Sequence, residues 1–217
     1  LSGAFFLNEP GSETFYYFPG QRRVRRMPTY AYDSPQSGFE NQYTLDEPFV
    51  FNGTIDRFNW KLVGKKEIYV PYNSFGAYDF TSKFEDVAQE DALAASHRRY
   101  EMHRVWVVEG TVKPGTRHTS PKKVIYLDED SWNTVLAEDY DAQGKLWKAR
   151  EGYLIPVYET GSCDVEAFAQ YNLTEGRYVF DMHGLAGKDV QWLTEPNGPR
   201  YKPSFYTSEK LRSISDR

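Results

Sequence analysis

The sequence predicts a mainly β protein of the α+β class, built on a strongly curved antiparallel sheet that forms a half-barrel with one or two helices. Short runs rich in Tyr, Phe, Val and Trp recur along the chain, separated by turn signals such as Pro19-Gly20 and Pro114-Gly115. Aromatic residues make up 17% of the 217 residues. Helical periodicity appears at only two places. The remaining regular segments are expected to form about eight to ten strands.

The first half of the chain opens with short strands. Residues 14–18 and 21–27 flank a Pro-Gly pair and predict a hairpin or meander. Residues 28–48 contain three prolines and little periodicity, which predicts a long loop, and loops of this length are often functional. Alternation over 58–62 and 66–70, around a Gly-Lys pair, predicts a second hairpin.

Helices are expected at two positions. Residues 83–97 lack Pro and Gly and carry a weak apolar stripe, which predicts the helix of the first half. A short helix is expected over 207–214, in a tail rich in Pro and charge. The remaining strands are predicted over 100–112, 122–128, 132–140, 145–158 and 176–182.

Several predicted strands carry bulky side chains on both faces. Residues 124–127 are Val, Ile, Tyr and Leu, and 153–158 show a similar run. A sheet with one solvated face alternates apolar with polar residues, so here a second layer covers the other face or that face lines a cavity. A plain sandwich core is the first interpretation, and an aromatic-lined hollow is the second.

Composition excludes several classes of protein. No uncharged apolar stretch approaches the roughly 20 residues that span a bilayer. The single cysteine, Cys163, excludes a disulfide framework. The net charge of -5 argues against nucleic-acid binding. No signal peptide opens the chain.

Catalytic signatures are absent from the sequence. It contains no G-x-S-x-G, H-E-x-x-H or C-x-x-C motif, so no catalytic residue and no cofactor are predicted. Glu101 and His103 share a strand face, and His118 follows the next turn, which makes these three the best candidates for a metal site. The alternative is that they pair with neighbouring arginines.

Arginines cluster near the start of the chain, at Arg22, Arg23, Arg25 and Arg26. Guanidinium groups at this density bind the phosphates of lipid head groups or of nucleic acid. Because the chain carries 31 acidic residues, we favour an anionic-lipid contact or internal ion pairs over nucleic acid.

Long stretches of the chain resemble a bacterial family of unknown function, numbered 1329. They are FPGQRRVRRMPTYAYDSP (18–35), DRFNWKLVGKKEIYVPYN (56–73), RRYEMHRVWVVEGTVKPGTRH (98–118), KKVIYLDEDSW (122–132), YDAQGKLWKAREGY (140–153) and FYTSEKLRSISDR (205–217). The resemblance covers roughly residues 5–217. The family is itself similar to the outer-membrane lipoprotein-sorting proteins of the LolA and LolB kind.

This resemblance implies a fold and a location. LolA-like proteins have an open, strongly bent antiparallel sheet closed by helices, with an apolar hollow that holds acyl chains. It implies that residues 1–217 form a single domain, the C-terminal part of a longer secreted protein whose signal lies before Leu1. The implied location is the periplasm of a Gram-negative bacterium. The resemblance supplies no catalytic residue.

The resulting hypothesis is a non-catalytic periplasmic binding or carrier protein for lipid or another hydrophobic molecule, acting with an envelope transporter or outer-membrane protein. The alternative is a structural or interaction module of a cell-envelope assembly, and a metal-dependent enzyme ranks third. An exposed sheet edge would allow a homodimer. The predicted ligand-lining residues are Phe15, Tyr17, Trp60, Leu62, Tyr69, Trp106, Val108, Tyr126, Trp147 and Phe180.

Overall fold

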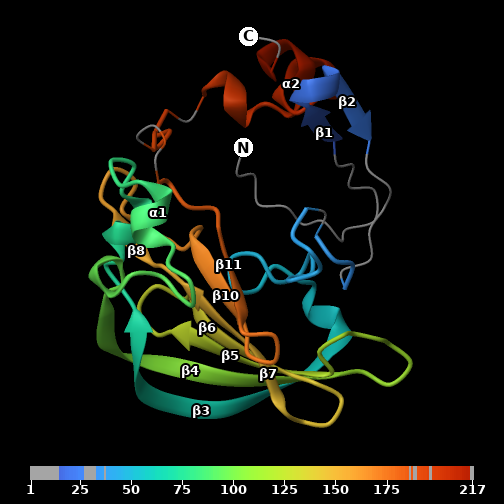
Figure 1. The fold of residues 1–217 in the computed structure, drawn as a ribbon, viewed down its shortest axis with the longest axis vertical. Coiled ribbons are helices and arrows are strands. Elements are labelled where there is room, and N and C mark those ends of the chain that lie inside the picture. The colour runs from blue at the N-terminus through green and yellow to red at the C-terminus, as the bar shows by residue number, and fades with distance from the viewer. Residues whose placement is uncertain are drawn as a thin grey trace.

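A seven-stranded antiparallel sheet forms the body of the molecule in the computed structural model (Figure 1). The structure describes residues 15–26, 33–36, 38–185, 187, 190–195 and 197–215. The strands follow the spatial order β11-β10-β7-β6-β5-β4-β3, so most neighbours in the sheet are also neighbours along the chain. The sheet is open and strongly curved, which confirms the mainly β, half-barrel fold predicted from the sequence.

The strands of this sheet are β3 (Phe58–Pro71), β4 (Tyr100–Val112), β5 (Lys122–Asp128), β6 (Thr134–Tyr140), β7 (Leu146–Gly152), β10 (Phe168–Asn172) and β11 (Arg177–Asp181). Two separate hairpins pair β1 (Phe15–Phe18) with β2 (Arg23–Arg26) and β8 (Ile155–Val157) with β9 (Ser162–Asp164). The α-helices are α1 (Phe84–Val87) and α2 (Ser208–Ser215). Short 3₁₀ turns occupy Pro19–Gln21, Ile55–Arg57, Phe75–Tyr78, Ala95–His97, Pro199–Tyr201 and Pro203–Phe205.

The hairpin predicted over 58–62 and 66–70 is wrong. These residues form one strand of 14 residues, β3, which pairs with β4 from Phe58 to Pro71. The register shifts between Leu62 and Gly64, so the Gly-Lys pair belongs to a β-bulge instead of a turn. A bulge bends and twists the strand, and β3 accordingly curves strongly along the lower edge of the sheet in Figure 1.

The helix predicted over 83–97 is also wrong. Only Phe84–Val87 is α-helical, and Ala88 then forms an isolated bridge with Leu93. The Gln89 side chain donates hydrogen bonds to two carbonyl groups of the short helix and so competes with its continuation. Val87 and Leu93, both at most 2% exposed, are buried in one apolar cluster, and tertiary packing therefore sets the local structure.

The two faces of the sheet carry different side chains. Lys123, Asp139 and Arg150 are buried on one face, which we call the ion face. Val105 and Val107 lie on the other, which we call the valine face. Residues 42–54, which we call the covering segment, pack over the ion face.

The valine face is covered as well. Leu154, Cys163 and Val165, in and around the β8–β9 hairpin, pack against its valine cluster. Residues 77–93 cover its far end over β10 and β11. Both faces are therefore covered over the centre of the sheet, which explains the bulky residues on both sides of β5 and matches the sandwich interpretation.

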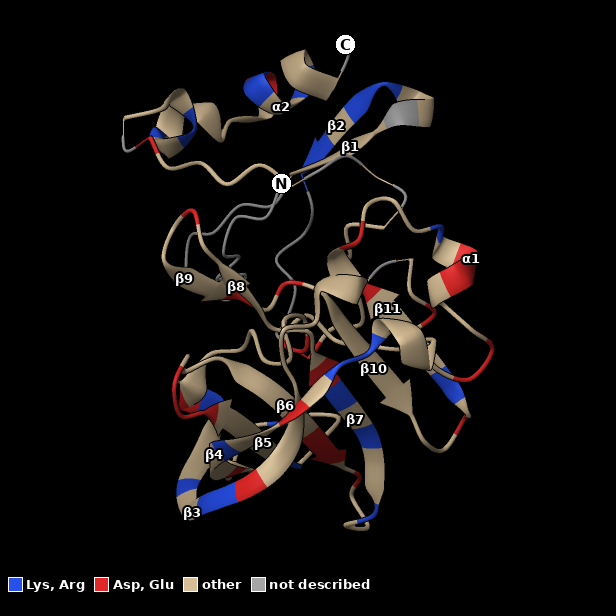
Figure 2. Ribbon diagram, turned by 90° about the vertical axis from the view of Figure 1, so that its left-hand side faces the viewer, with Lys and Arg blue, Asp and Glu red and all other residues tan. Residues whose placement is uncertain are grey.

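The β1–β2 hairpin and α2 lie together at one end of the molecule, away from the large sheet (Figures 1 and 2). α2 agrees with the helix expected over 207–214. Among the described residues, no helix has the length and apolar character needed to cross a membrane.

Candidate functional site

Buried charges attach the covering segment to the ion face. The acidic members come from the covering segment and β6, and the basic members from β5 and β7. Every member is at most 1% exposed, and the set is Asp46, Glu47, Asp139, Lys123, Lys148 and Arg150. Three negative and three positive charges balance, as burial of ionic groups requires.

The contacts within this network are direct. Lys123 Nζ lies 2.9 Å from Asp139 Oδ1 and 3.7 Å from Asp46 Oδ2. Arg150 pairs with Asp139, and its Nη1 lies 3.2 Å from Glu47 Oε1. The β5 and β7 side chains therefore reach both covering-segment carboxylates, and Asp139 of β6 pairs with two of the same basic groups. Residues 42–47 of the loop predicted over 28–48 are thus a buried structural layer.

Asp46, Asp139 and Lys123 of this network keep their charges at neutral pH. Burial by itself raises the pKa of Asp46, but Lys123 and the hydrogen bond with His118 outweigh burial and hold that pKa below its ordinary value. Burial likewise opposes ionisation of Asp139, and Arg150 with Lys123 lowers its pKa. For Lys123, the nearby carboxylates outweigh burial and raise the pKa.

Beyond the covering segment, the same face of the sheet is open to solvent. Leu62 lies opposite Val108, and Tyr69 lies opposite Met102, with Trp106 between them on β4. Directly opposed residues share a face, and so do residues two apart. Leu62, Tyr69 and Met102 are 60%, 65% and 53% exposed, so apolar surface is left uncovered. We call Leu62, Tyr69, Met102 and Trp106 the uncovered strip.

Charged groups accompany the uncovered strip. The Lys65 ammonium lies 4.2 Å from the centre of the Trp106 ring, a cation–π contact. Glu129 pairs with both Lys65 and Arg104. Apolar side chains and ion pairs therefore alternate along this surface, which suits a molecule with an apolar body and a polar end.

The structure brings together some of the predicted lining residues and separates others. Trp60 and Val108 pack against the ion-face cluster of Val50, and Leu62, Trp106 and Tyr69 continue along the same face. The remaining residues lie elsewhere: Tyr126 on the valine face, Phe180 in the cluster around Tyr153, Trp147 beside Lys148, and Phe15 and Tyr17 in the β1–β2 hairpin.

The middle of the ion face is filled by the chain itself. Val50 is 0% exposed and packs on Ile125 and Ala137, where the hollow interpretation expected a guest. Met102 was not among the predicted lining residues. Its exposure follows from where the covering segment ends, and no local sequence pattern marks that position.

The arginine cluster lines a cavity of about 580 Å³ between β2 and α2. Arg22, Arg23 and Arg26 contribute to its wall, and Arg212 of α2 joins them. Arg25 instead donates a hydrogen bond to Gln21 and lies over the Phe18 ring. The structure thus adds a basic residue distant in sequence to the predicted patch.

The three metal-site candidates do not meet. His103 Nε2 lies 3.7 Å from Glu101 Oε2. His118 lies beyond the far end of β4, which continues for nine residues after His103. Its Nε2 lies 2.9 Å from Asp46 Oδ2, and its Nδ1 accepts the Ser120 amide hydrogen bond. His118 therefore contacts the buried ion network through Asp46.

A known structure shares this fold. A domain from Vibrio parahaemolyticus with the provisional name of outer membrane lipoprotein-sorting protein aligns with 92% of this chain and 66% of its own, at a TM-score of 0.50 and 13% identity. A DUF1329 family protein from Desulfovibrio piger aligns over 78% of this chain and 56% of its own, at a TM-score of 0.48 and 14% identity. At these identities the first comparison shows the fold alone.

Sequence comparison is more specific. The uncharacterized protein PA3922 of Pseudomonas aeruginosa is 40% identical over 163 residues, which is 75% of this chain and 36% of that protein. The chain thus spans about a third of this curated relative. The profile of the family described as "protein of unknown function (DUF1329)" matches residues 6–212. The chain therefore belongs to the DUF1329 family, as its long motifs indicated.

Proposed function

We propose that this chain is a non-catalytic binding or carrier domain for a lipid or another hydrophobic molecule of the bacterial cell envelope. The observation that carries the proposal is the uncovered strip, where apolar residues of β3 and β4 remain exposed on the ion face beside its covered part. The fold shared with a domain named for lipoprotein sorting supports it. A periplasmic location in a Gram-negative bacterium and a transporter or outer-membrane partner belong to the same proposal.

Removal of an acyl chain from water supplies the driving force for such binding. An acyl chain gains about 0.8 kcal/mol for each methylene group that leaves water, so some 12 methylenes supply on the order of 10 kcal/mol before ordering costs. A micromolar dissociation constant requires about 8 kcal/mol. These figures apply to methylenes that leave water on all sides, so a chain lying on the open uncovered strip gains less from each methylene.

A fluorescent fatty acid tests the proposal. 11-(Dansylamino)undecanoic acid is titrated into the wild type and into the double variant Tyr69→Ser/Met102→Ser, and dansyl emission is recorded. We expect saturable binding that weakens at least about tenfold in the double variant, because two apolar contacts worth over 1 kcal/mol each are lost.

The matched control is Tyr158→Ser, which changes a tyrosine that is 80% exposed next to β8. This variant should bind as the wild type does. Absence of saturable binding to the wild type would refute the carrier proposal. Equal weakening in the double variant and in the control would refute the uncovered strip as the binding surface.

A second candidate function is an interaction module, and the arginine-lined cavity between β2 and α2 favours it. Four arginines line this cavity together with Glu209. Guanidinium groups bind the phosphates of an anionic membrane surface. This contact is compatible with a carrier that delivers its ligand at a membrane. Homodimerisation through the edge strand β3 remains a prediction, and light scattering tests it. The lysines and the bulge of β3 oppose pairing at this edge.

A further inference from the structure

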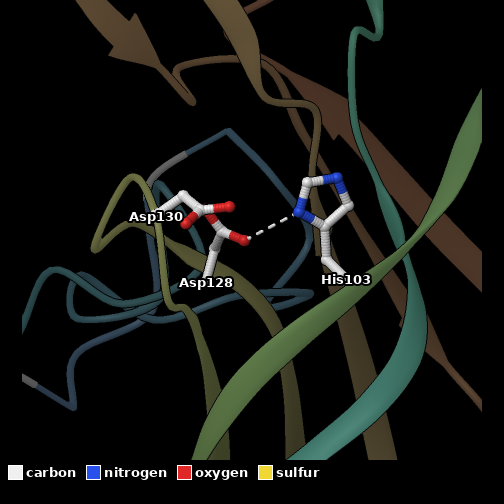
Figure 3. Close-up of side chains that lie close together, drawn as sticks. All are labelled: His103, Asp128 and Asp130. Carbon is white, nitrogen blue, oxygen red and sulfur yellow. Dashed lines mark ion pairs between the residues drawn. The ribbon is translucent and has the colours of Figure 1, made fainter.

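Three potential metal ligands meet where β5 ends. His103 comes from β4, Asp128 is the last residue of β5, and Asp130 lies in the turn that leads to β6 (Figure 3). One ligand atom from each lies within 4.8 Å of the others. Figure 3 shows the two carboxylates side by side, facing the imidazole. The cluster is on the valine face, away from the uncovered strip.

One carboxylate oxygen of Asp128 accepts hydrogen bonds, and the other accepts none from the described residues. Its Oδ2 accepts hydrogen bonds from the amide and hydroxyl groups of Ser131, at 2.8 and 2.7 Å. Its Oδ1 is buried and accepts no hydrogen bond from the described residues, although His103 Nδ1 lies only 3.2 Å away. The side chain is 0% exposed. A buried carboxylate oxygen without a donor is costly and calls for a cation.

The His103 ring is oriented from both sides. Tyr72 stacks on it, with ring centres 3.8 Å apart and planes at 20°. Glu101 faces Nε2 and is itself held by Asn73 and Arg99. A carboxylate faces each ring nitrogen, Glu101 at Nε2 (3.7 Å) and Asp128 at Nδ1 (3.2 Å). A metal at Nδ1 requires the ring proton to lie on Nε2, where Glu101 can accept it. Nδ1, the nitrogen beside Asp128, is the ring atom placed to act as a ligand.

We infer that His103 Nδ1, Asp128 and Asp130 bind a divalent first-row transition-metal ion such as Zn²⁺. Two ligand atoms 3.2 Å apart, each about 2.1 Å from an ion, subtend about 100° at it, between the tetrahedral and octahedral angles. One imidazole and two carboxylates suit Zn²⁺ or Mn²⁺ better than Ca²⁺, which takes oxygen ligands. Solvent supplies the remaining ligands on the exposed Asp130 side.

This site differs from the one predicted from the sequence. Of Glu101, His103 and His118, only His103 is a ligand here, and Glu101 orients it. The ion would join β4 to the β5–β6 turn and so stabilise the folded chain. The competing explanation is a plain His103–Asp128 ion pair that binds no metal.

Zinc uptake distinguishes the two explanations. Metal-free protein is titrated with Zn²⁺ by calorimetry, and with Co²⁺ while its visible absorption is recorded. We expect one equivalent of Zn²⁺ per chain, Co²⁺ bands typical of nitrogen and oxygen ligands, and a higher melting temperature with Zn²⁺. Asp130→Asn and His103→Gln should each weaken Zn²⁺ binding more than about tenfold.

Asp130 is exposed, so Asp130→Asn is expected to fold, and circular dichroism verifies this. The matched controls are Asp86→Asn and His97→Gln, which lie outside the cluster and should keep wild-type affinity. No stoichiometric uptake by the wild type would establish the plain ion pair and overturn the inference. Uptake that survives both ligand variants but falls in His97→Gln would overturn it as well. Neither result bears on the fatty-acid titration, so the two proposals fail separately.

Discussion

Lys148 and Glu47 lie 101 residues apart in the sequence and form a buried ion pair, with Nζ 3.1 Å from Oε2. Their side chains are 1% and 0% exposed. This pair joins β7 to the covering segment, and Glu47 also contacts Arg150. The position of the covering segment, and therefore of the uncovered strip beyond it, depends on contacts of this kind.

Removing the Glu47 charge should destabilise the fold. Glu47→Gln leaves Lys148 and Arg150 with too little compensating charge in a buried site, and breaking such a pair costs about 3 kcal/mol or more. The free energy of unfolding, measured with urea, should fall by that amount. The control is Arg177→Gln, which breaks an exposed pair with Glu40 and should change stability little. Equal losses in the two variants would contradict the role of the network.

Acid should unfold the protein through the same network. The pKa values of Asp46 and Asp139 are lowered in the folded state, so the unfolded chain binds protons more readily. The stability that they contribute is complete above their ordinary pKa of about 4 and is lost as pH falls through the lower folded values. Unfolding free energy measured between pH 7 and pH 2 should decline below about pH 5. In Asp139→Asn the decline should be shallower, and an unchanged slope would contradict this assignment.

Gly110 makes room for Trp60 across the β3–β4 pair. A Cβ at Gly110 would lie 2.6 Å from Cζ3 of the Trp60 ring, so Gly110→Ala forces the ring or the strand to move. Overpacking of this kind costs about 1–3 kcal/mol, which thermal unfolding measures. Gly20→Ala is the matched control, because nothing lies within 4 Å of the added carbon. A melting temperature of Gly110→Ala equal to that of the wild type would show that Trp60 is not fixed there.

The arginine-lined cavity predicts binding to anionic membranes. Vesicles rich in phosphatidylglycerol should retain the wild type in a flotation assay, and retention should decrease with salt. Arg22→Gln/Arg23→Gln should reduce retention about tenfold, whereas Lys61→Gln/Lys66→Gln on β3 should not. Equal loss in both variants would indicate general charge attraction instead of a site at β2 and α2.

Much of the sheet follows from local patterns. The strands at 100–112 and 122–128 are bounded by Pro, Gly and Ser, and their β-branched residues leave little choice of conformation. The bulge in β3 has the sequence pattern of a turn, because Gly64 suits either one and only the pairing with β4 decides between them. The residues at 83–97 favoured a helix locally, but burial of Val87 and Leu93 overrode that preference.

The candidate site was harder to predict. Burial of the covering segment depends on Glu47 meeting Lys148 and on Asp46 meeting Lys123, contacts between residues far apart in the chain. Leu62 and Tyr69 were identified by their type, but their exposure follows from where the covering segment ends. Likewise, Arg212 joins the arginine cluster only through the fold.

Photolabelling with a fatty acid tests the carrier proposal most directly. A diazirine-bearing fatty acid is irradiated with the protein, and the labelled residues are mapped by mass spectrometry, with and without excess lauric acid. We predict labels on β3 and β4 at Leu62, Tyr69 and Met102 that lauric acid displaces. Labels confined to other surfaces, or labels on these strands that lauric acid leaves unchanged, would contradict the carrier proposal.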